Sequence, residues 1–207
     1  MKIFNLLIPS VVIFIICGAN CVSKDQLYFR EDFKEIPAAI PITQEHIEHP
    51  DLRLHRHGQA ADSIKKSHHD NIPNDPYYVW SGLCTTGHWA ISFSKRNQTV
   101  DLTDGKIRIR TKQYGCHILR IILKTHTGDW LVSDHGFGET PDWHIFEPEL
   151  KIFKWHQLDI DQIIAGELIE SPDLSHIQAI GWSDLTVGEG SKGCTRVDWI
   201  EVYGTIK

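Results

Sequence analysis

The stretch KIRIRTK, residues 106–112, decides the fold class of this 207-residue chain. Its apolar residues, Ile107 and Ile109, alternate with Arg108, Arg110 and Lys112. Successive side chains of an extended strand point to opposite faces. The pattern therefore predicts a strand with one buried face and one face that carries three cations.

The following stretch, residues 117–124, repeats this alternation. Its apolar side chains are Leu119, Ile121 and Leu123, and Arg120 and Lys124 fall between them. A turn over residues 113–116 is predicted to join the two strands into an antiparallel hairpin. We therefore expect a basic, polar sheet surface on which the two strands lie side by side.

The rest of the chain indicates more short strands separated by Gly, Pro and Asp. They are expected at residues 26–33, 52–55, 77–83, 88–93, 130–133, 143–146, 155–159, 177–183 and 195–203. The segments 77–83 and 88–93 are interpreted as a strand pair. Long loops are expected at 35–51 and 57–76, with helical turns near 63–66 and 161–166. About ten short strands without long helices predict an all-β fold, a single antiparallel β-sandwich or jelly roll.

The composition excludes several classes of protein. Hydrophobic residues make up 41% and charged residues 23%, which excludes a disordered chain and a coiled coil. The 21 Lys and Arg against 27 Asp and Glu give a net charge of −6, which argues against a nucleic-acid partner. The 13 His and 7 Trp raise metal binding and sugar stacking as functions to test.

The N-terminus is typical of a secretory signal peptide. Lys2 precedes the mainly apolar run 3–16, and the small residues Gly18 and Ala19 follow it. The run is too short for a membrane-spanning helix. We expect a signal peptide over residues 1–21, one domain over 22–207, and a secreted, periplasmic or cell-envelope location. No membrane span is expected after the signal is removed, and the mature protein is expected to be a monomer.

Three cysteines remain after removal of the signal: Cys84, Cys116 and Cys194, without any CxxC spacing. They form either one disulfide and a free thiol or three small buried side chains. The second interpretation is slightly favoured, because a core of this size needs no covalent staple.

Four segments resemble the jelly-roll layout of secreted carbohydrate-binding modules of the galactose-binding-like superfamily. They are residues 87–93, 101–111, 180–184 and 196–204. The resemblance covers about Phe29 to Gly204 and implies a β-sandwich. It implies little about activity, since this fold carries lectins, enzyme modules and assembly factors. It also implies a structural Ca²⁺ held by Glu31, Asp32, Asp198 or Glu201, and no cofactor is otherwise expected.

The polar face of the predicted hairpin is the first candidate ligand site. Sugar hydroxyls need fixed donors and acceptors, and the apolar face of a pyranose needs an aromatic plate. Clustered cations would favour an acidic glycan. The predicted ligand-binding residues here are Arg108, Arg110, Lys112, Gln113, Arg120, Trp130, Asp134 and Trp143. The alternative is that the charges simply form a solvated face.

The loop KKSHHD, residues 65–70, is the second candidate site. Histidines beside an aspartate can act as a general base or ligate a metal. Lys66 and Asp70 are predicted ligand-binding residues, with Trp80 from the strand that follows. His68 and His69 are candidate catalytic bases, together with His135. The alternative is a surface loop that hydrogen-bonds its own backbone.

A third candidate is the pair His55 and His57, whose spacing places both imidazoles on one strand face. A zinc ion would need a third ligand from His46, His49 or His135. The positions of these three histidines in the sequence do not indicate which of them would bind, so no metal is assigned.

Three functions follow. The leading hypothesis is a secreted carbohydrate-binding β-sandwich without covalent chemistry. The second is a glycan lyase or glycoside-cleaving enzyme with a histidine base, in which Lys66, Arg110 or Arg120 stabilises the developing anion. The third is a protein–protein scaffold. Nucleotide-dependent and serine-hydrolase chemistry are disfavoured, because their glycine-rich and G-x-S-x-G motifs are missing from the sequence.

Overall fold

The computed structural model describes residues 26–115, 118–185 and 193–207. The predicted signal peptide and Cys116 lie outside these ranges. The strands are β1 (Leu27–Glu31), β2 (Leu52–His57), β3 (Lys65–Ser67), β4 (Tyr78–Trp80), β5 (Ala90–Lys95), β6 (Val100–Tyr114), β7 (Arg120–Thr125), β8 (Trp130–Ser133), β9 (His144–Phe146), β10 (Trp155–Asp159), β11 (Ile164–Ile169), β12 (Ile177–Ser183) and β13 (Cys194–Ile206). Three 3-10 turns, Gln44–His46, Ala61–Ser63 and Leu150–Ile152, are the helical elements of this part of the chain. The predicted all-β class is confirmed.

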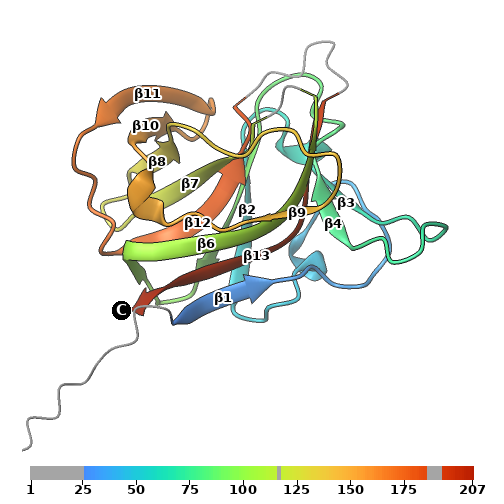
Figure 1. Cartoon of the computed structure of the whole chain (residues 1–207), viewed down its shortest axis with the longest axis horizontal. Helices are drawn as coiled ribbons and strands as arrows, with labels where there is room; N and C mark the ends of the chain where they lie inside the picture. Colours follow the sequence, from blue (N-terminus) through green and yellow to red (C-terminus); the bar gives the residue numbers. More distant parts are fainter. Residues whose placement is uncertain (1–25, 116–117, 186–192) are drawn as a thin grey trace, which may run out of the picture.

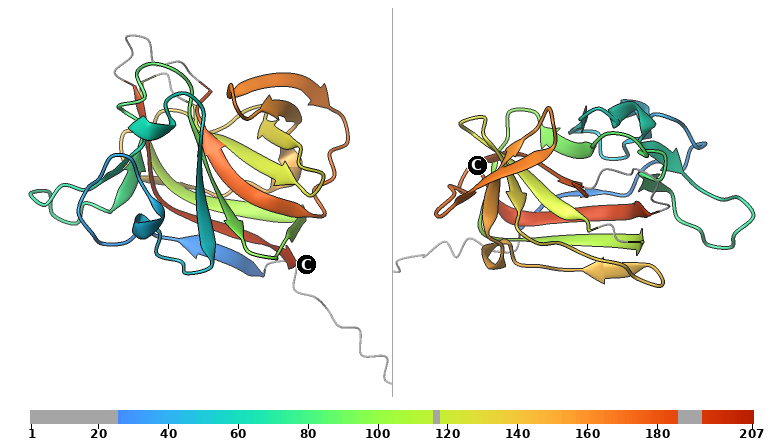
Figure 2. Two further views of the ribbon diagram at one scale, coloured as in Figure 1. Left: turned by 180° about the vertical axis from the view of Figure 1, so that it is seen from behind. Right: turned by 90° about the horizontal axis from the view of Figure 1, so that it is seen from above.

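The strands form one continuous antiparallel sheet that folds back on itself as a sandwich. In the β6–β13 layer, β13 pairs with β6 on one side and with β1 and β4 on the other. In the β5–β12 layer, β12 pairs with β5 and β7, and β8, β10 and β11 continue from β7. The pair Val100–Ile177, between β6 and β12, joins the two layers. Figure 1 shows β1, β13 and β6 side by side, and β2 crosses them in the view from behind (Figure 2).

The core lies between the two layers, and alternation decides which side chains enter it. Ile107 and Ile109 of β6 are fully buried, as the pattern of residues 106–112 predicts. They belong to the same cluster as Phe93 of β5, Leu123 of β7 and Trp182 of β12. The opposite side chains of β6 therefore form the outer face of the sandwich.

Three predicted local features are wrong. β6 and β7 form no hairpin: β6 pairs with β13 and β9, and β7 pairs with β12 and β8. β4 and β5 likewise pair with other strands rather than with each other. The segment 161–166 is a turn that leads into β11 rather than a helix. The alternation of apolar and polar residues determines which face of a strand is buried. Which strand pairs with it depends on tertiary contacts.

The two segments predicted as long loops contain short elements of structure. Residues 35–51 contain one short 3-10 turn, whereas residues 57–76 also contain β3, which pairs with β4. The helical turn predicted near residues 63–66 lies earlier, as a 3-10 turn at Ala61–Ser63, and Lys65–Ser67 form the strand β3. Both segments border one end of the β6–β13 layer, where they form the walls of a cleft. No helix in the described part of the chain is long and apolar enough to cross a membrane.

Candidate functional site

The outer face of the β6–β13 layer carries a row of cations, and each has a carboxylate partner from another segment. Arg108 pairs with Glu147 at 3.0 Å and Glu201 at 2.7 Å, and Arg110 pairs with Asp198. Lys106 pairs with Glu147, Lys112 with Asp142, and Arg30 with Asp32 and Glu201. The predicted cationic face therefore exists, but its charge is compensated.

A bulge in β13 supplies the acidic and aromatic members of this face. The register shifts between Val197 and Trp199, so one extra residue lies opposite β6. Asp198 and Trp199 can consequently both reach the outer side. The guanidinium carbon of Arg30 lies 4.5 Å from the centre of the Trp199 ring, and that of Arg108 lies 5.6 Å from it. These cation–π contacts hold the arginines and the indole in fixed positions.

A cleft of about 690 Å³ opens beside these groups. Arg30, Arg110, Asp198 and Trp199 form its floor on β1, β6 and β13. The segment between β1 and β2 contributes Asp32, Phe33, Glu35 and Glu48 to the walls, and the segment between β3 and β4 contributes Asp75, Pro76 and Tyr77. Its carboxylates outnumber its two arginines. Burial is the main reason that the pKa of Asp198 is raised, while its hydrogen bond with Arg110 opposes the rise.

A smaller cleft of about 170 Å³ adjoins the first one. Both are lined by Asp75, and the smaller cleft adds Lys112, Trp143 and Arg196 together with His69, Ile72 and Tyr78. Trp143 is half-buried and has the Arg110 guanidinium 5.3 Å from its ring centre. Trp143 is therefore a partly open aromatic plate on this face.

His69 is the candidate base that faces this smaller cleft. Its Nδ1 lies 2.9 Å from Asp75 Oδ2 and 3.3 Å from the Tyr78 hydroxyl. His68 instead stacks on Tyr77, with ring centres 4.0 Å apart, and its Nε2 lies 3.3 Å from the fully exposed Asp70. His135 lies elsewhere, next to Asp134 and Phe153. The loop histidines and His135 therefore do not form one catalytic group.

Two predicted site residues lie inside the protein. Gln113 is fully buried on the inner face of β6, where it bonds Thr111 and Thr195, so its predicted place on the outer face is wrong. β6 extends through the turn predicted at 113–116 as far as Tyr114, so Gln113 points to the same side as Ile107 and Ile109. Lys66 is also fully buried and donates to the carbonyl of Ile36 at 2.9 Å, so it cannot contact a ligand from the surface.

Arg120, Trp130 and Asp134 lie away from the cleft. Arg120 and Trp130 belong to β7 and β8 of the β5–β12 layer, and Trp130 packs with an apolar cluster on the outer side of that layer. Asp134 accepts a bond from the backbone of Lys154 after β8 ends. The prediction of one shared face failed because the hairpin that would have joined β6 to β7 does not form. Trp80 does lie beside the site, since it pairs with Arg196.

The metal predictions have different outcomes. His55 and His57 share one face of β2, as predicted, but their Nε2 atoms contact the hydroxyls of Ser94 and Ser92. Within the described ranges no third ligand completes a group with them. Of the four expected calcium ligands, Glu31 accepts three backbone N–H groups, and the other three pair with arginines. A calcium ion there stays a prediction.

The sequence did not indicate five residues of this face and its cleft: Arg30, Tyr77, Trp199, Asp142 and Glu147. It indicated Asp32, Asp198 and Glu201 only as calcium ligands. The outward position of Trp199 could not be predicted, because the bulge interrupts the alternation of β13. The loop carboxylates carry no pattern that places them near β6.

A scan against models of known protein families finds no match, and neither does a search of curated protein sequences. Solved structures with a similar arrangement include the family 11 carbohydrate-binding module of the cellulase Lic26A-Cel5E of Clostridium thermocellum. Its identity is 16%, it covers 87% of this chain and 95% of its own, and its TM-score is 0.46. The Clostridium thermocellum module in complex with a β-1,3-1,4-mixed-linked tetrasaccharide has 16% identity, coverage of 83% and 98%, and a TM-score of 0.47. The carbohydrate recognition domain of Emp47p has 8% identity, coverage of 89% and 98%, and a TM-score of 0.40.

Proposed function

We propose that this chain is a carbohydrate-binding β-sandwich that holds a glycan in the cleft over β1, β6 and β13. The main support for this proposal is a cleft of about 690 Å³ in which Arg30, Arg110 and Asp198 surround Trp199. Ligand sites of this size hold drug-sized molecules of several rings. Paired guanidinium and carboxylate groups offer both donors and acceptors, as hydroxyl groups require.

The charges of the cleft favour a neutral glycan over the acidic one expected from the sequence. Every arginine of the cleft already has a carboxylate partner. Glu35, Glu48 and Asp75 add negative charge to the walls. A uronate or sulfate group would meet this negative surface, whereas a neutral sugar can exchange hydrogen bonds with both members of each pair.

A screen of the full-length chain on an array of neutral and acidic glycans tests this function, followed by calorimetry on the hits. Arg110→Ala should weaken binding about 10-fold or more, because it removes a donor from the cleft. Trp143→Ala should have a similar effect, because it removes the aromatic plate that contacts Arg110 from the adjoining smaller cleft. Trp130→Ala and Arg120→Ala are matched controls on the other layer and should leave affinity unchanged. Loss of binding in the controls alone would overturn the proposal.

A second candidate function is a glycan lyase, favoured by one observation. Asp75 orients the imidazole of His69 at 2.9 Å, and Lys112 and Arg196 line the same small cleft. In uronate elimination, His69 Nε2 would take the proton from C5. The C–H electron pair would form the C4=C5 double bond as the C4–O bond breaks, and the leaving oxygen would take a proton from water.

Product analysis separates the two functions. A lyase should release unsaturated products, and His69→Ala should abolish their release while leaving the melting temperature of the protein nearly unchanged. A binding protein should retain every hit without products, and His69→Ala should leave turnover at zero. Products that persist in His69→Ala would contradict the assigned base.

A further inference from the structure

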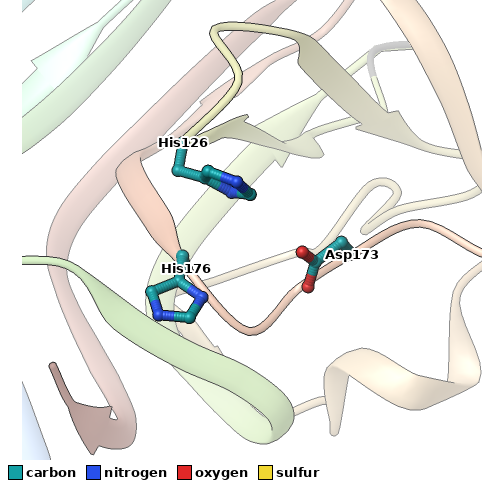
Figure 3. Close-up of side chains that lie close together, drawn as sticks. All are labelled: His126, Asp173 and His176. Carbon is teal, nitrogen blue, oxygen red and sulfur yellow. The ribbon is translucent and has the colours of Figure 1, made fainter.

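A second cluster of chemically active side chains lies where β7 and β12 meet, on loops outside the proposed glycan cleft. His126 begins the turn between β7 and β8, whereas Asp173 and His176 belong to the segment between β11 and β12. Thr125 of β7 pairs with Ile177 of β12, so each histidine lies next to a member of this pair. The three side chains therefore lie close together (Figure 3), although the strands β8 to β11 separate His126 from Asp173 in the sequence.

The three side chains lie close together, but their ligand atoms are farther apart than in a metal-bound site. One ligand atom from each of His126, Asp173 and His176 lies within 4.8 Å of the others. The two imidazole centres are 5.6 Å apart. Tetrahedral Zn²⁺ with bonds of about 2.0–2.1 Å brings its ligand atoms to about 3.3 Å from one another. All three side chains are exposed, so small rotations can close the remaining gap without moving the core.

Ser175 orients two of the three ligands. Its hydroxyl donates to Asp173 Oδ1 at 2.6 Å, and its backbone N–H donates to the same oxygen at 2.9 Å. The same hydroxyl lies 2.9 Å from His176 Nδ1. These contacts hold the Asp173 carboxylate and the His176 imidazole side by side.

The donor set selects the class of ion. Two imidazoles and one carboxylate suit Zn²⁺ and similar divalent transition metals, whereas Ca²⁺ and Mg²⁺ prefer oxygen ligands alone. Ser175 donates two hydrogen bonds to Asp173, which hold the carboxylate of this oxygen ligand in place.

A cavity of about 350 Å³ lies directly beside the cluster, and both His126 and Asp173 line it. Its other walls include Thr125, Leu131 and Gln157. We propose that His126, Asp173 and His176 bind one divalent transition-metal ion, with Zn²⁺ as the best match. Three protein ligands leave a coordination position for water or a ligand oxygen.

Zinc binding by the full-length chain tests this site. Metal is removed with EDTA, the chelator is dialysed away, and Zn²⁺ is titrated by calorimetry. We expect one ion per chain, and His126→Ala or His176→Ala should weaken binding at least 10-fold. The double variant His55→Ala/His57→Ala removes the same number of imidazoles from the other candidate pair and should bind normally. Ser175→Ala keeps every ligand and should weaken binding about 10-fold, as loss of an orienting partner does.

Two further readouts make the result decisive. Co²⁺ should give the intense visible absorption of a low-coordinate site in the unaltered protein and not in the His126→Ala variant. The melting temperature should rise with Zn²⁺ only where His126 and His176 are both present, because a ligand that binds the folded state stabilises it. The site is rejected if the protein binds no Zn²⁺, or if binding depends on His55 and His57 instead.

Discussion

At the scale of single residues, Glu31 shows how one buried carboxylate shapes the cleft. It is fully buried at the end of β1, and its oxygens accept the backbone N–H groups of Phe33 at 2.8 Å, Glu48 at 2.8 Å and His49 at 3.0 Å. Burial raises the pKa of Glu31, and these three hydrogen bonds oppose the rise. Through them Glu31 fastens the loop that places Glu48 in the wall of the cleft.

Glu31→Ala should therefore destabilise the protein by about 3 kcal/mol, because it leaves three backbone donors without a partner. Urea unfolding measures this loss. Glu31→Gln keeps one carbonyl oxygen as an acceptor and should cost clearly less. Equal stability of the Ala variant and the unaltered protein would show that the loop does not depend on this carboxylate.

Lys66 is a second buried charge. Its ammonium lies 3.8 Å from the centre of the Tyr77 ring and donates to the carbonyl of Ile36. Burial lowers its pKa to about 8 from the ordinary 10.5. Below pH 8 both the folded and the unfolded chains carry the charge, and the folded state bears the full cost of burying it. Between pH 8 and 10.5 the unfolded state binds more protons, so stability should rise with pH.

The variant Lys66→Met removes this titration while it keeps most of the volume of the side chain. The free energy of unfolding of the unaltered protein, relative to that of Lys66→Met, should increase from pH 7.5 toward pH 10. Denaturant unfolding at several pH values measures the difference. A difference that stays flat over this range would mean that Lys66 titrates normally in the folded protein.

At the scale of elements, alternation predicted the strands but not their neighbours. In the strand Val100–Tyr114, the pattern of residues 106–112 extends over residues 105–114, whereas Val100 and Leu102 are buried with the opposite parity. The same rule placed Leu119, Ile121 and Leu123 in the core. The predicted hairpin failed because two strands that are adjacent in sequence belong to opposite layers. A pattern of period two contains no information on which strand lies next in the sheet.

Gly181 is a point where this packing of strands can be tested. It lies on β12 between Ser92 of β5 and Ile122 of β7, and a Cβ at this position would overlap the carbonyl oxygen of Ile91. Gly181→Ala should therefore destabilise the protein by about 3 kcal/mol, since backbone atoms cannot move aside easily. Thermal unfolding monitored by circular dichroism measures the effect.

Gly138→Ala is the matched control, because a Cβ there meets nothing within 4 Å. Its stability should stay within about 0.5 kcal/mol of that of the unaltered protein. Equal effects of the two substitutions would contradict the close approach of β5 and β12 at Gly181.

At the scale of the whole molecule, the site depends on pairings that span the chain. Arg110 meets Asp198, and Arg108 meets Glu201 and Glu147, only because β6 lies between β13 and β9. The cations and Trp143 could be predicted from the sequence, but the carboxylates that neutralise them could not. The sequence therefore predicts a positive face, whereas the folded chain has a charge-balanced one.

Because the cations of this face are paired with carboxylates, we expect the affinity for a neutral glycan to be nearly independent of salt concentration. Between about 50 and 500 mM NaCl the dissociation constant should change by less than about two-fold, because salt screens charges and leaves uncharged hydroxyl groups unaffected. Calorimetry at several salt concentrations measures this, and a sulfated form of the same glycan is the comparison. A steep loss of affinity for the unsulfated glycan would favour an electrostatic mode of binding.

The position of β13 also determines how the protein is oriented when it is immobilised on a solid support. The backbone of Gly204 bonds that of Gln26, and Lys207 bonds Thr99, so both ends of the described sandwich meet at one corner (Figure 1). Trp199 lies seven residues before Ile206 on the same strand, which at about 3.3 Å per residue is about 23 Å away. A protein tethered through this corner to a bead or a sensor chip would direct its cleft outward, open to long polymers in the surrounding liquid.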